Sequence, residues 1–272
     1  MEKGKSIRLT IIISYYKALD NLKVILHAFK HQSVMDFEII VSEDDDNEET
    51  ISFLQDYTRT SSFTIHHLHQ DKDIGFRKNM MLNKSLRFCR TDLVAFIDGD
   101  CIPHRHFVKA YLEQIREGIF LGGRAVMLGK DLSASILKHH SIDKLHFLTL
   151  LFSDSKKVKE GLHFPYFPLT HKIRGLSGRN WGVMKKYLFD INGFDEDYQA
   201  AGVGEDVDIE WRLMAYGLRR ESIKNKAIVY HLYHPRGYGQ EGVQHNYALL
   251  KSKQESKHIR CLHGIDNLDN TV

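Results

Sequence analysis

Short apolar runs alternate with amphipathic stretches through the first hundred residues of the chain. The runs are rich in β-branched residues and end in polar ones, which is typical of strands in a buried sheet. They predict strands at 6–14, 37–42, 63–68 and 93–97. Between them, apolar residues recur at helical spacing, as Leu22, Ile25 and Phe29 do, and helices are predicted at 20–31, 47–57 and 75–88.

The order of these elements predicts the fold class. Strands that alternate with helices form right-handed crossovers and a parallel sheet with helices on its faces. We therefore expect an α/β fold with a mostly parallel central sheet. Ligands of such sheets bind at the carboxyl ends of the strands, so the residues that follow each strand are the first candidates for a functional site.

The second half of the chain has a less regular pattern. Periodicity is weaker over 130–174 than in the flanking segments. Asp206, Ile209 and Leu213 have helical spacing after a glycine-rich loop, so a helix is expected to begin near residue 206. The run AIVYHLYHP at 227–235 starts as a strand would.

Length and composition indicate one large globular domain. The 272 residues are 42% hydrophobic and 27% charged, which is ordinary for a soluble protein. The net charge of +3 comes from scattered Lys and Arg and does not indicate a nucleic-acid partner. Three cysteines without CxxC spacing fit a reducing compartment. No apolar run approaches the roughly 20 residues of a membrane span, so we expect neither an anchor nor a secretion signal.

The fourth predicted strand ends in two carboxylates, Asp98 and Asp100, separated by Gly99. Carboxylates this close repel each other, and the arrangement becomes favourable when a cation bridges them to another anion. Oxygen ligands favour Mg²⁺ or Mn²⁺ bound together with the phosphates of a substrate. The alternative is a turn in which Asp and Gly serve only the backbone geometry.

Polar residues after other predicted elements have two interpretations each. One carboxylate of the acidic run at 43–46 would accept a base N–H, or the run is a solvated loop with a helix cap. Arg77 faces a diphosphate or is a surface residue. The acidic pair at 205–206 is catalytic or complements a helix dipole. His231 and His234 are metal ligands or ordinary core and surface residues.

Taken in order, these segments resemble the motifs of the inverting glycosyltransferases of family 2, which have the GT-A fold. The first strand leads to SYYK, the second to EDDD in the place of DDGS, and the third to GFR with a downstream asparagine. DGD, GRN, NGFDE and GED then follow. The resemblance covers about residues 6–235. Over this range the chain is similar to the transferase domains of bacterial chondroitin and hyaluronan-type polymerases and to the C-terminal segment of the β-1,4-galactosyltransferases. The ordered set is specific, although no single motif is.

The resemblance implies a role for each matching position. The cofactor-binding set would contact nucleotide, diphosphate and sugar, and it comprises Ser14, Tyr16, Asp44 at the uracil, Arg77 at the diphosphate, Asn83, Asp98 and Trp181 in the sugar pocket. The metal would be held by Asp98, Asp100 and His231, with His234 as the alternative histidine. Asp206 would be the catalytic base, and Glu205 would hold acceptor or donor hydroxyls.

The sequence departs from the family pattern near two of these positions. Glu43 stands where an aspartate is usual, and Asp45 and Asp46 replace Gly and Ser. The tryptophan that precedes GED in galactosyltransferase relatives is absent. The donor sugar and the acceptor are therefore left open.

The implied activity is transfer of a hexose or N-acetylhexosamine, with inversion, from a UDP-sugar to a saccharide or lipid-linked acceptor with Mn²⁺ or Mg²⁺, in surface polysaccharide synthesis. We expect a single GT-A domain over 1–240, with a nucleotide-binding half over about 1–128, an acceptor-binding half over about 129–240 and a polar helix or tail at 241–272. The expected location is the cytoplasm, at the inner face of the membrane if the acceptor is lipid-linked. No nucleic-acid partner is expected.

Two other functions remain open from the sequence. A sugar-phosphate nucleotidyltransferase also uses an α/β sheet with metal-binding acids, but it normally has a glycine-rich basic loop after the first strand, which SYYKALDN lacks. A non-catalytic nucleotide-sugar-binding protein would keep the same pocket without turnover.

Overall fold

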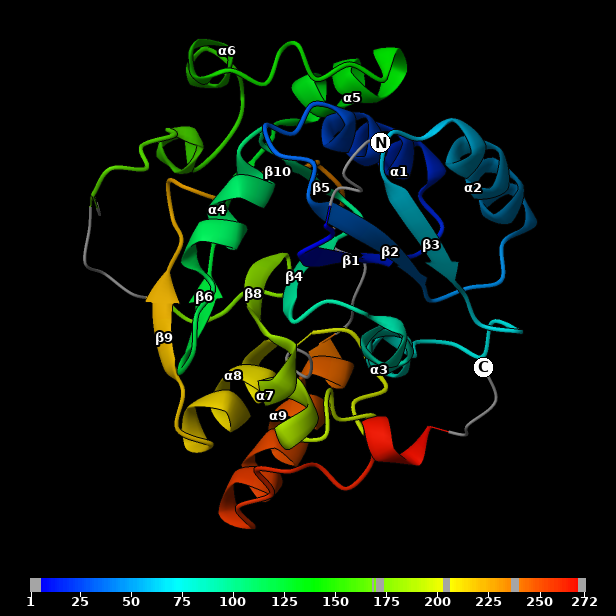
Figure 1. The fold of residues 1–272 in the computed structure, drawn as a ribbon, viewed down its shortest axis with the longest axis vertical. Helices are drawn as coiled ribbons and strands as arrows, with labels where there is room; N and C mark the ends of the chain where they lie inside the picture. The colour runs from blue at the N-terminus through cyan, green and yellow to red at the C-terminus, as the bar shows by residue number, and fades with distance from the viewer. Residues whose placement is uncertain (1–5, 168, 170–173, 203–205, 236–239, 269–272) are drawn as a thin grey trace.

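A computed structural model of the chain describes residues 6–167, 169, 174–202, 206–235 and 240–268. Its larger sheet has seven strands in the order β3-β2-β1-β4-β8-β6-β9 (Figure 1). These are β1 (Leu9–Tyr15), β2 (Phe37–Glu43), β3 (Thr64–Leu68), β4 (Leu93–Asp98), β6 (Ile119–Gly122), β8 (Asn180–Met184) and β9 (Arg219–Ser222). The first four strands along the chain pair in parallel, and β8 runs antiparallel to both β4 and β6. The predicted α/β fold with a mostly parallel sheet is confirmed.

A second sheet of three strands begins directly after the DGD turn. Its order is β5-β10-β7, with β5 (Cys101–Pro103), β10 (Ile228–His231) and β7 (Arg124–Met127). His231 pairs with Cys101 on one side and with Met127 on the other. This ladder brings the late segment at 228–231 next to the end of β4.

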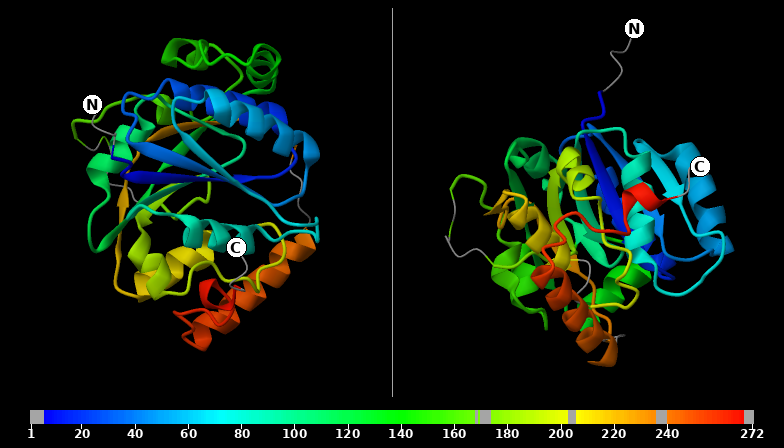
Figure 2. Two further views of the ribbon diagram at one scale, coloured as in Figure 1. Left: turned by 45° about the vertical axis from the view of Figure 1, so that its right-hand side comes forward. Right: turned by 90° about the horizontal axis from the view of Figure 1, so that it is seen from below.

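Helices cover both faces of the larger sheet (Figures 1 and 2). One face packs against α1 (Leu19–Lys30), α2 (Glu48–Thr60) and α4 (Phe107–Gln114). The other packs against α3 (Lys78–Phe88), α7 (Lys185–Asp190) and α8 (Asp206–Ala215). The remaining helices are α5 (Lys130–His139), α6 (Phe147–Leu151), α9 (Gln240–Glu255) and the short 3₁₀ turns η1 (Val158–Gly161) and η2 (Ile265–Asn267). The helices α5 and α6 lie at the opposite end of the molecule from α9 (Figure 1).

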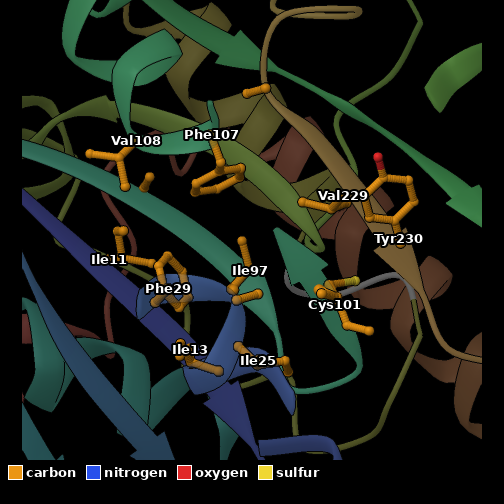
Figure 3. Packing of buried hydrophobic residues seen from close by; sticks show 14 of the residues in the cluster. Ile11, Ile13, Ile25, Phe29, Ile97, Cys101, Phe107, Val108, Val229 and Tyr230 are labelled. Atoms are coloured by element: carbon orange, nitrogen blue, oxygen red, sulfur yellow. The ribbon is translucent and has the colours of Figure 1, made fainter. Parts of the chain in front are cut away.

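Side chains along β1 point alternately to the two faces of the larger sheet, which explains why each face has its own hydrophobic core. Ile11 and Ile13 point to the face covered by α1, where they pack with Phe29 and Ile97 (Figure 3). Ile12 points to the opposite face and belongs to the cluster under α3 and α8. Full burial of each such side chain contributes about 1.5–3 kcal/mol, so a strand that is buried on both faces must be apolar at nearly every position.

Two helix starts show where local sequence signals predict a helix boundary and where they do not. Asn47 caps α2 as predicted, because its side chain accepts the backbone N–H of Thr50 at 3.0 Å. The helix expected from residue 75 instead begins at Lys78. Gly75 has φ +85°, which a helix does not allow, and the backbone N–H of Arg77 is bonded to the side chain of Asp44.

The helix α8 is fixed by an ion pair within the core. Arg212 and Asp208 are 0% and 1% exposed, and Arg212 Nε lies 2.6 Å from Asp208 Oδ2. Arg212 also donates to the carbonyl oxygens of Ile191 and Gly193 at 3.0 and 2.7 Å. The pair therefore ties α8, and with it Asp206 at its start, to the loop after α7.

We expect Arg212→Met to lower the free energy of unfolding by about 3–5 kcal/mol, because it leaves Asp208 charged and unpaired in the core. Urea unfolding measures this change. Arg59→Met is the control, since Arg59 makes a similar intrahelical pair with Asp56 at 3.0 Å on an exposed surface and should change stability little. Equal effects of the two substitutions would contradict the anchoring role.

Candidate active site

The DGD turn is shaped by close contact with β1. The backbone N–H of Gly99 donates to the carbonyl oxygen of Ser14 at 2.7 Å. A Cβ at position 99 would lie 2.9 Å from that oxygen, so a larger residue requires the backbone to shift. The backbone explanation is thus correct for Gly99, but it accounts for neither carboxylate. Those carboxylates lie at the carboxyl edge of the sheet, as expected.

Asp100 lies between two histidines. Its Oδ2 is 3.2 Å from His231 Nε2 and 3.1 Å from His234 Nε2. Ligand atoms of these three residues all lie within 4.8 Å of one another. Hydrogen bonding to Asp100 raises the pKa of His234 to about 8, and the two histidines hold the pKa of Asp100 well below its usual range despite its burial. One carboxylate and two imidazoles form a ligand set suited to a divalent transition metal.

Sheet register explains why these residues meet. His231 is the last residue of β10, and the backbone N–H of Leu232 donates to the carbonyl oxygen of Asp100 at 2.9 Å. The side chain of His231 is only 11% exposed, whereas that of His234 is 52% exposed. The structure therefore brings together both histidines that the sequence left as alternatives.

One cavity of about 790 Å³ contains the predicted metal ligands and the predicted base. Asp98, Asp100 and His231 line it on the side of the DGD turn, and Asp206 lines it at the start of α8. Lysines from the segments after β7 and α6 also line the cavity, namely Lys130, Lys156 and Lys157. Acidic and basic side chains thus share one space large enough for a substrate.

Asp206 occupies a sheltered position at the first residue of α8. Its carboxylate accepts the backbone N–H of Gly178 at 3.3 Å, and burial raises its pKa above the ordinary value of 3.8. A carboxylate with a raised pKa is a better proton acceptor than an exposed one. Glu205, the other predicted catalytic residue, lies outside the described residues.

Asp44 organises the edge beside β1 and β2. It is 7% exposed, and it accepts Gln70 Nε2 at 2.7 Å and the backbone N–H of Arg77 at 2.9 Å. Burial raises the pKa of Asp44 to about 6. Tyr16, by contrast, is 53% exposed, and its hydroxyl lies 3.5 Å from Asp73.

This edge also holds polar atoms that lack partners in the described part of the chain. Gln70 Oε1 and Asp45 Oδ2 are buried without a hydrogen bond among the described residues. Such atoms cost free energy unless a ligand or water satisfies them. Gln70 is not among the predicted site residues, and its position two residues after β3 was the available signal.

Three cationic side chains lie near the acidic residues of the site, and the sequence did not show which of them contribute to it. The guanidinium of Arg77 bonds back to the carbonyl oxygen of Phe76 at 2.8 Å. Lys78 lies 2.9 Å from Asp98, and Arg179 lines the cavity with its Nη1 3.6 Å from Met127 Sδ. Neither Lys78 nor Arg179 was predicted. A cation in the first turn of a helix opposes the dipole, and Lys78 could have been singled out for that reason.

Two predicted contacts are corrected by burial. Trp181 is 2% exposed and stacks on Phe96 with ring centroids 4.3 Å apart, so it is a core residue and not part of the sugar pocket. Asn83 is 0% exposed, and its amide bonds to both backbone groups of Phe194 at 2.8 Å. It fixes α3 to the loop after α7 and does not reach the cavity.

Comparison with known proteins places this site in context. Residues 10–188 match the model of glycosyl transferase family 2. A chondroitin synthase from Escherichia coli is 25% identical over 82% of this chain and 34% of its own length. A hyaluronan synthase from Pasteurella multocida is 24% identical over 77% of this chain and 23% of its own length. The chain thus spans about a third or less of the length of these curated relatives.

A likeness in fold extends over nearly the whole chain. A mannosyltransferase from Pyrobaculum calidifontis, solved in complex with GDP-Man and Mn²⁺, superposes with a TM-score of 0.59 at 14% identity. The match covers 94% of this chain and 64% of that one. At this identity the comparison shows the GT-A architecture alone.

Proposed function

This chain belongs to glycosyl transferase family 2, and we propose that it transfers a hexose or N-acetylhexosamine from a UDP-sugar, with inversion and with Mn²⁺, to a hydroxyl of a saccharide or lipid-linked acceptor. The process would be synthesis of a surface polysaccharide. One observation carries the proposal: Asp100, His231 and Asp206 line a single cavity. Such a transfer requires a metal-binding group and a carboxylate base that share one space.

The nucleotide would lie along the carboxyl ends of β1, β2 and β4. Ser14 and Tyr16 lie at the end of β1, and Ser14 pairs in register with Asp98. One of the unsatisfied oxygens of Gln70 and Asp45 would accept the single ring N–H of a uracil. Asp44 supports this edge by holding Gln70 and the loop before α3, so its contribution to uracil binding is partly indirect.

The ligand set fits a divalent cation. Asp100, His231 and His234 would hold it, and two imidazoles favour Mn²⁺ over Mg²⁺, which prefers oxygen ligands. Bound there, the metal would neutralise charge that develops on the departing diphosphate. Asp98 lies outside this group of three in the described part of the chain, and its pairing with Lys78 suits it to the ribose instead.

Arg179 is the arginine among the described residues that line the cavity, and it would meet the diphosphate. It lines the cavity, and no carboxylate pairs with it among the described residues. A guanidinium presents several donors to phosphate oxygens and stabilises charge that grows as the bond to the sugar breaks. We therefore transfer to Arg179 the role that the family resemblance suggested for Arg77.

Asp206 would take the proton from the acceptor hydroxyl as that oxygen attacks the anomeric carbon. The new bond forms on the face opposite the leaving diphosphate, so the configuration inverts. The bond from the sugar to the phosphate breaks with its electron pair on the phosphate, and the proton passes to the carboxylate. Water exclusion by the sheltered position of Asp206 favours the acceptor hydroxyl as nucleophile.

A screen of nucleotide sugars by thermal unfolding, with and without Mn²⁺, tests the donor and the metal together. A UDP-sugar at roughly 100 times its Kd should raise the Tm by about 5 °C with Mn²⁺ and by much less in EDTA. Stabilisation only by GDP-sugars would contradict the uracil assignment. Equal stabilisation in EDTA would contradict the metal.

Slow hydrolysis of the stabilising donor separates an enzyme from a binding protein. We expect Mn²⁺-dependent release of UDP that is lost in Asp206→Asn. Binding without release in any condition would favour the non-catalytic alternative. Release of a sugar 1-phosphate and a nucleoside monophosphate unit would favour a nucleotidyltransferase-type reaction.

A further inference from the structure

The short helix α6 presents large apolar side chains to solvent. Leu150 is 0% exposed and packs into the core, whereas Phe147, Leu148, Leu151 and Phe152 are 37%, 63%, 54% and 86% exposed. Along the chain, the exposed positions are adjacent or lie three to five residues apart. The helix therefore places them together on the side away from Leu150. Contiguous exposed apolar side chains of this kind mark an interaction surface.

Positive charge surrounds this apolar face. Between 130 and 159 the chain has six lysines against three aspartates, an excess equal to the net charge of the entire chain. Lys144, Lys156 and Lys157 flank α6 in sequence, and all three are exposed. None of the three is in an ion pair within the described residues. Their charges are thus available to an external anionic partner.

The apolar face also adjoins the mouth of the active-site cavity. Asp154, Lys156 and Lys157 line that cavity and follow Phe152 by two to five residues. Lys156 forms a backbone bridge with Met127, which in turn pairs with His231. A partner that covers α6 would therefore lie near the residues that line this cavity.

We infer that the α6 surface, comprising Phe147, Leu148, Leu151 and Phe152 with Lys144, Lys156 and Lys157, docks on an anionic lipid bilayer. Apolar insertion and attraction of lysines to anionic headgroups act together there, and two such contributions are needed for stable peripheral binding. None of the described helices is long and apolar enough to cross a membrane. A second copy of the chain fits this surface less well, because a symmetric contact would place lysines against lysines.

The α6 surface has a matched control at the other end of the molecule. Leu262 and Tyr247 are 59% and 53% exposed, and Tyr247 lies on α9, remote from α6 (Figure 1). Exchange of one aliphatic and one aromatic residue for serine at each end matches the two variants in the kinds of side chain that are removed. The two double variants are Leu148→Ser with Phe152→Ser and Leu262→Ser with Tyr247→Ser.

Co-sedimentation with vesicles tests the inference. The unaltered protein should bind vesicles of phosphatidylglycerol mixed with phosphatidylcholine and not vesicles of phosphatidylcholine alone, and binding should weaken as salt rises. The α6 double variant should bind at least about tenfold more weakly, and the control variant should bind as the unaltered protein does. Lys144→Glu should also weaken binding to the anionic vesicles relative to the unaltered protein, although it leaves the apolar side chains in place.

Three results would overturn the inference: no binding to anionic vesicles, equal binding of the two double variants, or a concentration-dependent dimer that only the α6 variant abolishes. Unaltered unfolding midpoints establish that both variants fold. The vesicle assay needs neither donor nor acceptor, so its outcome is independent of the proposed transfer reaction. Release of UDP from a soluble donor should be the same in both variants and in the unaltered protein.

Discussion

Asp206→Asn should lower kcat for sugar transfer by about 10³-fold and leave the Kd for the donor with Mn²⁺ within a few-fold. An asparagine keeps the shape of the side chain and its acceptor oxygen toward Gly178, but it cannot take the proton of the acceptor hydroxyl. A general base typically contributes 10²–10⁴-fold, roughly, to the rate. Steady-state transfer rates and donor titrations measure the two quantities separately.

The control for this substitution is Asp131→Asn, which removes an exposed carboxylate from the first turn of another helix. It should leave transfer near the unaltered rate. Retention of most turnover in Asp206→Asn would exclude Asp206 as the base. A parallel loss of donor affinity would instead indicate that Asp206 contributes mainly to binding.

The raised pKa of Asp206 adds a pH signature to the same experiment. Protonation inactivates a base, so kcat/KM should fall as pH decreases through the pKa of Asp206. Because burial raises that pKa above 3.8, the acid limb should lie at a higher pH than for an ordinary aspartate. An acid limb at or below the ordinary value would contradict the sheltered position.

Asp100→Ala should abolish measurable Mn²⁺-dependent binding of the donor, with a loss of more than about 100-fold in metal affinity. Changes to residues that merely hold ligands in place already cost roughly 10–100-fold. The substitution removes the carboxylate that faces both histidines at 3.1 and 3.2 Å. Calorimetric titration of Mn²⁺ in the presence of UDP measures the loss.

His140→Ala provides a comparison, because His140 is an exposed histidine whose Nε2 lies 3.2 Å from Asp20 Oδ1. We expect it to bind metal and UDP as the unaltered protein does. Donor binding by the unaltered protein that persists in excess EDTA would refute the metal site regardless of the Asp100 variant. Binding of the Asp100 variant at full affinity would place the cation elsewhere.

Local patterns predicted those elements whose determinants lie within a few residues. The β-branched runs gave β1 to β4, and the cap at Asn47 gave the start of α2, because periodicity and side-chain capping act over short distances. The start of α3 was missed since a distant carboxylate, Asp44, holds the preceding backbone. In the less regular second half of the chain, the structure forms α5, α6 and η1, and η1 contacts β7 and β10 of the second sheet.

The residues of the candidate site also divide into those predicted from local sequence patterns and those that depend on distant contacts. Asp98 and Asp100 followed from the abrupt end of an apolar strand, and Asp206 from the start of a helix. Trp181 was assigned to the sugar pocket because it lies beside the GRN turn, whereas its packing partner Phe96 comes from β4. The place of Arg179 in the cavity lining depends on the position of β8 between β4 and β6, and an antiparallel insertion of this kind has no local signature.

The β5-β10-β7 ladder has a consequence for biosynthesis. Asp100 leaves the ribosome well before His231 and His234 are translated, by on the order of ten seconds at roughly 5–20 residues per second. A nascent chain thus lacks two of the three proposed metal ligands, and capture of the proposed cation would have to await pairing of β10. Premature termination before residue 228 would release a polypeptide that lacks both imidazoles of the proposed metal site.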